Sequence, residues 1–469
     1  MKKARRQPVL GRIRRIHMVG IGGIGMSSIA LVLLDRGYRV EGSDLVKSDI
    51  TNALEARGAV IHEGHAEGQV ADADVVVYSS AVNPATNPET VAAAKRHIPL
   101  ISRSEMLGEL MRMKFGIGIA GTHGKTTSTS MVGLVVKEGG FDPTIIVGGK
   151  VTVFGTNAVA GEGDIIVIEA DEYDRAFLRL TPVLAVITTV EADHLDIYSD
   201  IEDIRAAFLQ FANSVPFFGA AIICLDDPVL QDMAGGIERR LITYGTARQA
   251  MIRAEYVSQT GSTSRFHVVA HGKPLGWIDL GAPGIYHVRN ALAAVSVGLE
   301  LDMEFERIRA GIARYTGVQR RFQILGEAAG VLVIDDYAHH PTEIVATLQA
   351  ASDGFAERRI VAVFQPHLYS RTEDFSEDFA RSFFNADTLI VTDIYAARET
   401  PRDGIDGKLI ADLARARGHR DVHWVREKER VKDELLATCN AGDVVVFLGA
   451  GDIWRVAHEF VGVLGELQS

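Results

Sequence analysis

The residues best suited to chemistry lie between positions 115 and 128, where an apolar run ends in a glycine-rich loop. The stretch reads Phe-Gly-Ile-Gly-Ile-Ala-Gly-Thr-His-Gly-Lys-Thr-Thr-Ser, and a helix is predicted over about 126–138, ended by two glycines. A strand, a glycine loop and a helix in this order can bind phosphate. Backbone N–H groups and the helix N-terminus face the anion, Lys125 adds positive charge, and the hydroxyl of Thr126 can hold Mg²⁺.

This loop departs from the usual phosphate-binding pattern, Gly-x-x-x-x-Gly-Lys-[Ser/Thr]. The first glycine of that pattern would replace Ile119, whereas the chain has Gly121. The difference argues against an ordinary P-loop GTPase or transport ATPase. A strand-to-helix turn that binds no ligand is the simpler alternative. We disfavour it because the lysine and the threonine stand at the helix start, where phosphate binding needs them.

Two acidic clusters follow predicted buried strands in the middle of the chain. Residues 169–172 read Glu-Ala-Asp-Glu, and residues 191–196 read Glu-Ala-Asp-His-Leu-Asp. Parallel strands present ligand-binding groups at their carboxyl ends, and Mg²⁺ takes one or two protein carboxylates together with phosphate oxygens. Each residue alone could equally cap a helix or end a solvated strand. Behind one phosphate loop, the two clusters together favour metal binding.

A second glycine turn lies near the N-terminus, between a predicted strand over 16–19 and a predicted helix. Residues 20–25 fit Gly-x-Gly-x-x-Gly, and Asp44 follows about twenty residues later, where a ribose contact is expected. We expect a nucleotide or diphosphate ligand here, because glycines permit close approach of the backbone. The motif by itself does not identify NAD, and a tight turn without a ligand is the alternative.

Length and composition set outer bounds on the function. A chain of 469 residues predicts two to four domains, and 47% hydrophobic with 23% charged residues is typical of a soluble globular protein. The formal net charge of −12, without a long basic run, argues against nucleic-acid binding. Cys224 and Cys439 offer neither a disulfide framework nor metal-ligand spacing, which favours a reducing compartment. Glycines interrupt the apolar residues 16–34, so we expect no signal peptide or membrane span there.

Strand and helix patterns alternate along the rest of the chain, which predicts an α/β fold with mostly parallel sheets. Further strands are predicted over 74–79, 99–101, 165–168, 183–190, 331–334, 360–364, 388–392 and 444–448. The alternation over 265–280 predicts a hairpin, and Pro341 suits the first turn of a helix. The adjacent His339 and His340 should point apart, so we expect them to line a polar cleft and not to chelate zinc together.

Six motifs in this order resemble the Mur ligase family, in particular its alanine-adding branch. They are GTHGKTT at 121–127, EADE at 169–172, EADHLD at 191–196, HVRNA at 287–291, DDYAHHPTE at 335–343 and FQPHLYSRT at 364–372. With the glycine turns, the resemblance runs from Gly20 to Gly451. It implies three α/β domains: an N-terminal Rossmann-like UDP-sugar domain over 1–113, a central P-loop ATPase-like domain over 114–320, and a C-terminal Rossmann-like domain over 321–469. The C-terminal domain would close over ATP and the amino acid.

The resemblance also assigns site residues by position. Catalytic roles fall to Lys125, His194, His339 and Arg371. ATP contacts fall to Gly121, Thr122, His123, Gly124, Lys125, Thr126, Thr127, Asn290, Arg321 and Asp335. The metal would be held by Thr126, Glu169 and His194. The UDP-sugar would contact Gly22, Gly25, Ser43, Asp44, His65 and Ser80, and the amino acid would contact Tyr337, His339 and Arg371.

Two features bear on the branch of the family. Several relatives that add later amino acids carry a carbamylated lysine after the second acidic motif, and residues 204–213 hold no lysine, which fits the alanine-adding branch. That branch often has arginine at the position of Leu368, so this chain departs from its relatives in the expected amino-acid pocket.

The implied activity is ATP-dependent ligation of L-alanine to the carboxylate of UDP-N-acetylmuramic acid in peptidoglycan precursor synthesis. An acyl phosphate would be the intermediate, ADP and phosphate the products, and Mg²⁺ or Mn²⁺ the metal. We expect a cytoplasmic enzyme, monomeric or weakly dimeric. A recycling ligase that attaches a preformed peptide is one alternative. A nicotinamide-dependent dehydrogenase is another, but it leaves Gly124-Lys125-Thr126 unexplained. An ATP-dependent switch without ligase activity is the third.

Overall fold

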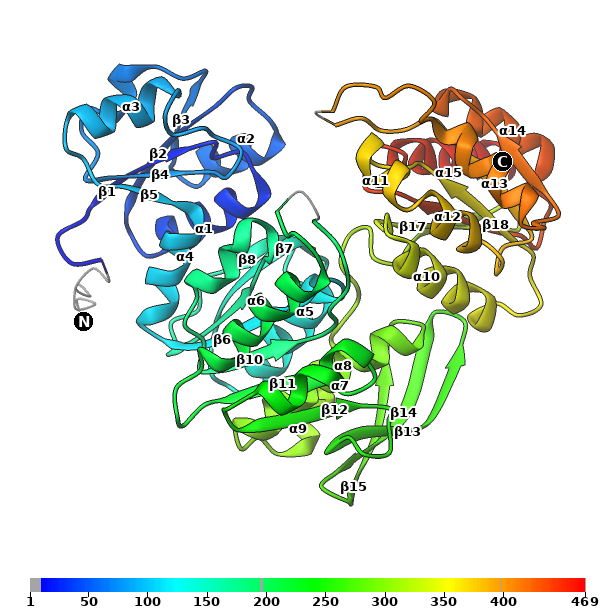
Figure 1. The fold of residues 1–469 in the computed structure, drawn as a ribbon, viewed down its shortest axis with the longest axis horizontal. Helices are drawn as coiled ribbons and strands as arrows, with labels where there is room; N and C mark the ends of the chain where they lie inside the picture. Colours follow the sequence, from blue (N-terminus) through cyan, green and yellow to red (C-terminus); the bar gives the residue numbers. More distant parts are fainter. Residues whose placement is uncertain (1–9, 195–196, 398, 469) are drawn as a thin grey trace. The chain divides into compact units, whose positions relative to one another are not determined.

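The computed structural model describes residues 10–194, 197–397 and 399–468, which form three β-sheets connected by helices (Figure 1). Leu195 and Asp196, the last residues of the second acidic motif, lie outside the described residues. By their contacts the residues form two compact units. The first comprises 1–255, 268–276 and 289–315, and the second comprises 256–267, 277–288 and 316–469.

The first sheet is parallel throughout and has the strand order β3-β2-β1-β4-β5. Its strands are β1 (Arg15–Val19), β2 (Arg39–Asp44), β3 (Val60–Glu63), β4 (Val75–Tyr78) and β5 (Leu100–Ser102). Its helices are α1 (Ile24–Asp35), α2 (Asp49–Ala56), α3 (Pro88–Lys95) and α4 (Arg103–Arg112). The strand order reverses between β1 and β4. In open parallel sheets such a reversal makes a ligand-binding crevice at the carboxyl ends of the strands, and the glycine turn after β1 lies there.

The second sheet has ten strands in the order β15-β14-β13-β12-β11-β10-β6-β9-β7-β8. In the first unit it contains β6 (Phe115–Ala120), β7 (Thr144–Val151), β8 (Thr156–Val159), β9 (Ile165–Glu169), β10 (Leu184–Ile187), β11 (Ala220–Cys224) and β12 (Leu241–Gly245). The strand β6 pairs in parallel with both β9 and β10. Its carboxyl end therefore lies beside the ends of the two strands that lead into the acidic motifs, as the sequence predicts.

The strands β13 (Ile252–Thr260), β14 (Thr263–Ala270) and β15 (Lys273–Leu280) complete this sheet, and the predicted hairpin over 265–280 is confirmed as β14 and β15. The associated helices are α5 (Lys125–Glu138), α6 (Ile201–Asn213), α7 (Pro228–Met233), α8 (Ile285–Glu300) and α9 (Phe305–Ala313). The helix α5 ends before Gly139, as predicted. A Cβ added to Gly311 of α9 would lie 2.6 Å from Cα of Val135 in α5, so this glycine lets the two helices pack closely.

The third sheet has the order β16-β17-β21-β18-β19-β20 and is parallel except for β16. Its strands are β16 (Gln323–Ala328), β17 (Val331–Asp336), β18 (Ile360–Phe364), β19 (Thr388–Val391), β20 (Val422–Trp424) and β21 (Val444–Leu448). Its helices are α10 (Pro341–Gly354), α11 (Tyr369–Asp374), α12 (Ser376–Arg381), α13 (Gly407–Ala416), α14 (Val431–Thr438) and α15 (Trp454–Gln468). The antiparallel edge strand β16 was not predicted.

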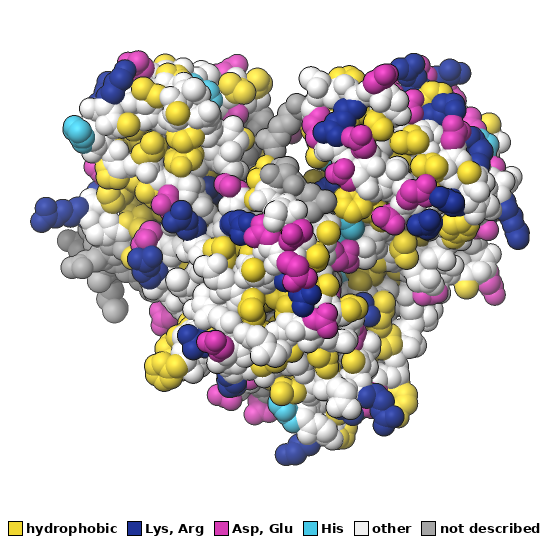
Figure 2. All heavy atoms as spheres, viewed as in Figure 1, with side chains coloured by type: hydrophobic (Ala, Val, Ile, Leu, Met, Phe, Trp, Pro, Cys, Tyr) yellow, Lys and Arg dark blue, Asp and Glu magenta, His cyan; other side chains and the backbone are white. Residues whose placement is uncertain are grey.

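The third sheet is apolar on both faces. Val444 and Val446 of β21 belong to one buried cluster, whereas Val445 and Phe447 belong to another. Strands buried on both sides read as continuous apolar runs, which is the pattern that predicted the strands over 360–364 and 444–448. Among the described residues, no helix combines the length and the apolar character needed to cross a bilayer. Acidic and basic side chains are interspersed on the face of the molecule drawn in Figure 2.

Candidate active site

The predicted phosphate loop occupies residues 121–124, between β6 and α5. Gly121 has φ +141° and Gly124 has φ +80°, which are left-handed conformations that favour glycine. A Cβ on Gly121 would lie 2.0 Å from Oγ1 of Thr188, and one on Gly124 would lie 2.6 Å from Oδ1 of Asn290. Both glycines are therefore required by backbone conformation and by space. Thr127, the last residue of the motif, is buried in the first turn of α5.

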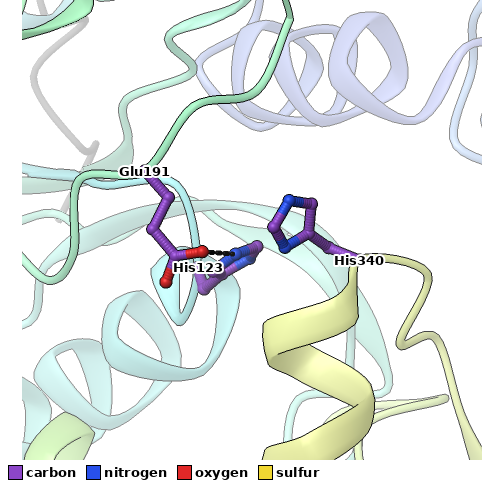
Figure 3. A group of neighbouring side chains, drawn as sticks. All are labelled: His123, Glu191 and His340. Atoms are coloured by element: carbon purple, nitrogen blue, oxygen red, sulfur yellow. Dashed lines mark ion pairs between the residues drawn. The ribbon is translucent and has the colours of Figure 1, made fainter. Parts of the chain in front are cut away.

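Residues that follow β10 hold this loop. The backbone N–H of Thr122 donates to the carbonyl of Thr189 at 2.9 Å, and that of His123 donates to Oγ1 of Thr189 at 2.9 Å. In return, the N–H of Glu191 donates to Oγ1 of Thr122 at 2.9 Å. The side chains of His123 and Glu191 point toward one another, with Nε2 and Oε2 3.5 Å apart (Figure 3). The backbone N–H groups of Thr122 and His123 thus both bond to Thr189.

Lys125 is partly buried among acceptors. Its Nζ lies 2.6 Å from the carbonyl oxygen of Gly121, 3.1 Å from that of Thr122 and 2.8 Å from Oε1 of Glu172. Burial acts to lower the pKa of Lys125, but the negative charge of Glu172 and of its acidic neighbours outweighs burial and raises that pKa. The lysine is therefore a fixed cation. Glu172 received no role from the sequence, although its place in the first acidic motif was a usable signal.

Thr126 and Glu169 form the oxygen-rich part of the site. The hydroxyl of Thr126 donates to Oε1 of Glu169 at 2.9 Å, and the N–H of Gly148 donates to Oε2 at 2.6 Å. Burial raises the pKa of Glu169. A hydroxyl and a carboxylate are ligand types that Mg²⁺ accepts, and a cation would offset the cost of burying the charge. The residues present therefore fit a magnesium ion.

His194 approaches this group through Glu172. Its Nε2 lies 3.6 Å from Oε1 of Glu172, and its ring packs edge-on against Tyr173 at 5.2 Å between centroids. Burial acts to lower the pKa of His194, but its interactions with Glu172 and Asp193 outweigh burial and raise it. The backbone of His194 has φ +54°, a strained value for a residue other than glycine. The predicted residues Lys125 and His194 thus share one carboxylate.

Asn290, for which a nucleotide contact is predicted, lies against the phosphate loop. It is buried, and its Oδ1 accepts a hydrogen bond from Oγ of Ser128 at 3.1 Å. The preceding Arg289 donates to Oδ2 of Asp226 at 2.7 Å, and Asp226 also accepts from the backbone N–H groups of Thr246 and Ala247. These contacts hold the part of α8 that belongs to the first unit, from Arg289 onward.

Three predicted residues of the second unit gather around one carboxylate. Arg321 Nη1 lies 3.2 Å from Oε1 of Glu343, and Nδ1 of His339 lies 3.2 Å from Oε2 of Glu343. The ring of Tyr337 packs against both, with the Arg321 guanidinium 5.2 Å and the His339 ring 5.1 Å from its centroid. Sequence reasoning gave Glu343 no role. As predicted, His339 and His340 have different ring neighbours, since His340 packs against Phe375.

The remaining predicted residues of this unit lie elsewhere in it. Asp335 is buried, and its Oδ2 accepts from Nε of Arg320 at 3.2 Å. Arg320 also donates to the backbone carbonyls of Gly449 and Gly451, so a protein side chain lies against the last glycine turn. Arg371 belongs to the short helix α11, which directly follows Leu368. Leu368, where the family resemblance leads to the expectation of an arginine, has φ +68°, a strained value for a residue other than glycine.

The N-terminal glycine turn is held against β2. The N–H of Gly22 donates to Oδ2 of Asp44 at 2.8 Å, and a Cβ on Gly25 would lie 2.2 Å from Nη1 of Arg103. Asp44, for which the motif predicts a ribose contact, therefore also bonds to the turn itself. Ser43 is fully buried, and its hydroxyl donates to Oε2 of Glu89 at 2.7 Å. Ser80 is exposed after β4.

Arg103 and Asp171 connect the two predicted ligand regions. Nη2 of Arg103 lies 3.2 Å from Oδ2 of Asp171, which belongs to the first acidic motif. A small cavity in the same region is lined by Arg103, Asp171 and Glu169, among others. The first unit thus places the glycine turn of the first sheet near the carboxylates behind the phosphate loop. Sequence reasoning did not identify Arg103.

Comparisons with known proteins cover nearly the whole chain. Residues 15–115 match the model of the Mur ligase family, catalytic domain, residues 119–298 match the Mur ligase middle domain, and residues 320–451 match the Mur ligase, glutamate ligase domain. The chain is 64% identical over 464 residues to a UDP-N-acetylmuramate–L-alanine ligase from Salinibacter ruber, covering 99% of this chain and 98% of that protein. It is 49% identical over 457 residues to the protein of the same name from Geobacter sulfurreducens, covering 97% and 99%.

Solved structures give the same result. The crystal structure of the UDP-N-acetylmuramate–alanine ligase from Thermotoga maritima matches with a TM-score of 0.80 and 29% identity, covering 97% of this chain and 99% of that one. A murein peptide ligase from Psychrobacter arcticus matches with a TM-score of 0.69 and 25% identity, covering 96% and 99%. The predicted three-domain α/β fold is confirmed by the first of these matches.

Proposed function

Because the chain belongs to the Mur ligase family, we infer that it ligates L-alanine to the carboxylate of UDP-N-acetylmuramic acid and converts ATP to ADP and phosphate. The observation that carries this inference is the near-full-length identity of 64% to a relative named for that reaction. The geometry agrees with it, since a partly buried lysine, a hydroxyl and a carboxylate lie together at a strand-to-helix loop. The Thermotoga maritima alanine ligase is also a better structural match than the murein peptide ligase, which disfavours the recycling alternative.

The residues of the first unit would divide the work as follows. The carboxylate of the sugar attacks the γ-phosphate of ATP, and Lys125 neutralises charge on the transferred group. Thr126 and Glu169 would hold Mg²⁺, which neutralises phosphate charge when bound. His194, oriented by Glu172, would face the reacting groups. The amine of L-alanine then attacks the acyl phosphate and displaces phosphate, which completes the amide.

The finer assignments are part of the same proposal. Asn290, Arg321 and Asp335 would contact the nucleotide, and Tyr337, His339 and Arg371 would contact the amino acid. The cluster around Glu343 supports this division, because it holds Arg321 of the nucleotide group beside Tyr337 and His339 of the amino-acid group. The domain boundaries at 113/114 and 320/321, a cytoplasmic location, and a monomer or weak homodimer complete the proposal.

ADP release with a panel of acceptors tests this function. We expect ADP formation that requires UDP-N-acetylmuramic acid and L-alanine together, with little product from glycine and none from a tripeptide acceptor. A strong preference for the tripeptide would instead identify a recycling ligase. ATP hydrolysis without the UDP-sugar would identify a switch.

A further inference from the structure

A buried carboxylate of helix α3 packs against the first sheet, and the proposed reaction gives it no role. Glu89 stands in the first turn of α3 and is 0% exposed. Its Oε2 accepts from Oγ of Ser43 at 2.7 Å and lies 3.0 Å from Nε2 of His17. Its Oε1 lies 3.3 Å from Nδ1 of His65 and accepts from the N–H of Ala66 at 3.3 Å.

These contacts supply Glu89 with four hydrogen-bond donors, which is the number that an ionised carboxylate can accept. Burial acts to raise the pKa of Glu89, but the hydrogen bonds from His17 and Ser43 outweigh burial and hold that pKa below its usual value. The position in the first turn of α3 also favours a negative charge. Glu89 is therefore ionised, and its partners must present protons to it.

That requirement fixes the proton on His65. The hydroxyl of Ser43 donates its one hydrogen to Glu89, so at its 3.0 Å contact with Nδ1 of His65 the hydroxyl oxygen is the acceptor. Nδ1 of His65 therefore carries the hydrogen and faces Ser43 and Glu89. In the neutral imidazole the other nitrogen, Nε2, is then left with a lone pair as a hydrogen-bond acceptor. The side chain of His65 is 16% exposed, so part of it is accessible from outside the protein.

The same group of residues supports the glycine turn. The backbone carbonyl of Ser43 accepts from the N–H groups of Gly20 at 2.8 Å and of Ile21 at 3.0 Å. The next residue, Asp44, accepts from the N–H of Gly22 at 2.8 Å. Glu89 thus holds the strand end that positions the turn, and it holds the histidine that follows β3. Both lie at the carboxyl edge of the first sheet, where ligands of such sheets bind.

We propose that Glu89 is a positioning residue for the UDP-sugar: it holds His65 as the Nδ1–H tautomer, so that Nε2 accepts a hydrogen bond from a hydroxyl or amide N–H of the sugar nucleotide. This proposal rests on the proposed function, because it takes the first domain to be the UDP-sugar site. It adds a buried residue, remote from the reacting atoms, that controls substrate affinity through another side chain.

The substitution Glu89→Gln tests the proposal, because it preserves side-chain size and removes one acceptor. Measured by calorimetry, the Kd for UDP-N-acetylmuramic acid should rise about ten-fold, as expected for one misdirected hydrogen bond. The Kd for ATP and kcat at saturating substrate should change less than about two-fold. The matched control Glu63→Gln makes the same chemical change at an exposed residue ending β3, and it should leave all three unchanged. A Glu89→Gln variant with lowered melting temperature but unchanged UDP-sugar affinity would show a structural role only and overturn the proposal.

Two further measurements keep the test independent of folding defects in that variant. Nitrogen NMR of the wild-type protein with ¹⁵N-labelled histidine should show His65 as the Nδ1–H tautomer, with its signal identified by its loss in His65→Gln. The Nε2–H tautomer there would overturn the proposal. The variant His65→Ala should also weaken UDP-sugar binding about ten-fold, and adding Glu89→Gln should cost little more, since residues that act together are not additive. Additive losses would contradict it.

The choice of ligand shows which part of the sugar nucleotide supplies the hydrogen-bond donor to His65. It also distinguishes failure of this proposal from failure of the proposed function. Weaker binding of UDP alone would place the donor on the uridine, whereas a loss seen only with UDP-N-acetylmuramic acid would place it on the amino sugar. Either result supports the proposal. Wild-type protein that binds the UDP-sugar but does not ligate alanine would refute the proposed function and leave the Glu89 measurements valid. Wild-type protein that does not bind the UDP-sugar would refute both.

Discussion

Nζ of Lys125 lies 2.8 Å from Oε1 of Glu172 in the interior of the first unit. The same oxygen lies 3.6 Å from Nε2 of His194. Glu172 therefore sets the positions of two groups that the proposed reaction requires, and it adds negative charge beside a loop expected to bind phosphates. The nucleotide must compete with Glu172 for Lys125, which makes both residues informative targets for mutation.

Lys125→Ala should abolish ligation and leave UDP-sugar binding nearly intact. The two predicted ligand regions lie on different glycine turns, one near Gly22 and one near Gly124. Loss of a cation that neutralises the transferred phosphoryl group should lower kcat more than about 100-fold. Steady-state kinetics and calorimetry with UDP-N-acetylmuramic acid measure the two effects. Activity above a tenth of the wild-type value would contradict the assignment of this loop as the phosphate-binding site.

Glu172→Gln should lower kcat by about ten-fold or more, while the melting temperature changes little because the side chain keeps its size. The physical reason is the loss of the charge that orients Lys125 and His194. The control is Glu202→Gln, an exposed residue of α6 with 71% of its side chain accessible, which should be neutral. Unchanged kcat in Glu172→Gln would show that Lys125 needs no protein counter-ion.

Nucleotide binding should require Mg²⁺ or Mn²⁺, and Glu169→Ala should weaken it. The motivation is the 2.9 Å contact between the Thr126 hydroxyl and a buried carboxylate. Loss of the metal-binding carboxylate should cost about ten-fold or more in ATP affinity with Mg²⁺ present, and much less with EDTA. Calorimetry under both conditions measures this difference. Equal affinity of the wild-type protein for ATP with EDTA and with Mg²⁺ would contradict the assignment of Thr126 and Glu169 as metal ligands.

The second unit should lose stability as the pH rises through the pKa of Asp336. Burial raises the pKa of Asp336 from 3.8 to about 6, although Arg321 and the N–H groups of Phe322 and Ala338 favour its charged form. Between those two values the native state binds more protons than the unfolded state, so the free energy of unfolding falls as pH rises. The full cost, about 3 kcal/mol, is present above pH 6.

The substitution Asp336→Asn isolates this effect. The melting temperature of the variant minus that of the wild type should increase from pH 4 to pH 7. Loss of a hydrogen bond would add a constant to this difference but would not change its trend with pH. The control Asp353→Asn, at an exposed position of α10, should show no such trend. A pH-independent difference between wild type and Asp336→Asn would mean that Asp336 is not a buried carboxyl with a raised pKa.

Local patterns were enough to predict several of the strands, the helix over 126–138 and both glycine turns. The apolar run before Gly121 and the helix from Lys125 are continuous in sequence, so their hydrophobic pattern and end signals determine them. The edge strand β16 was missed because its residues Gln323–Ala328 show no clear alternation and are partly exposed. An edge strand is stabilised by its pairing partner more than by its own pattern.

Contacts between distant segments could not be predicted from the residues alone. The carboxylate of Glu89 reaches Ser43, 46 positions away, and Lys125 reaches Glu172, 47 positions away. The sequence places acidic residues at strand ends but does not say which of them turns toward the lysine. Asp44 shows the same limit, since the sequence did not predict its hydrogen bond to the glycine turn.

The chemical intermediate provides the most direct test of the reaction. Cys224 and Cys439 are the two cysteines, and burial raises the pKa of each thiol to about 12, so neither is an available thiolate nucleophile at neutral pH. The carboxylate of the sugar must then be activated by ATP, through phosphorylation or adenylation. Lys125 at the phosphate loop favours transfer of the γ-phosphoryl group, with ADP as product.

UDP-N-acetylmuramic acid labelled with ¹⁸O in its carboxylate distinguishes these routes. Attack of a carboxylate oxygen on the γ-phosphorus forms the P–O bond of an acyl phosphate. When alanine attacks the carbonyl carbon, the C–O bond breaks and one labelled oxygen leaves with phosphate. Mass spectrometry should therefore find one ¹⁸O in each inorganic phosphate released in H₂¹⁶O. A control reaction with unlabelled sugar in H₂¹⁸O should give unlabelled phosphate, because water takes no part in the transfer. Unlabelled phosphate from the labelled sugar, or AMP with pyrophosphate, would exclude the acyl phosphate and with it the proposed mechanism.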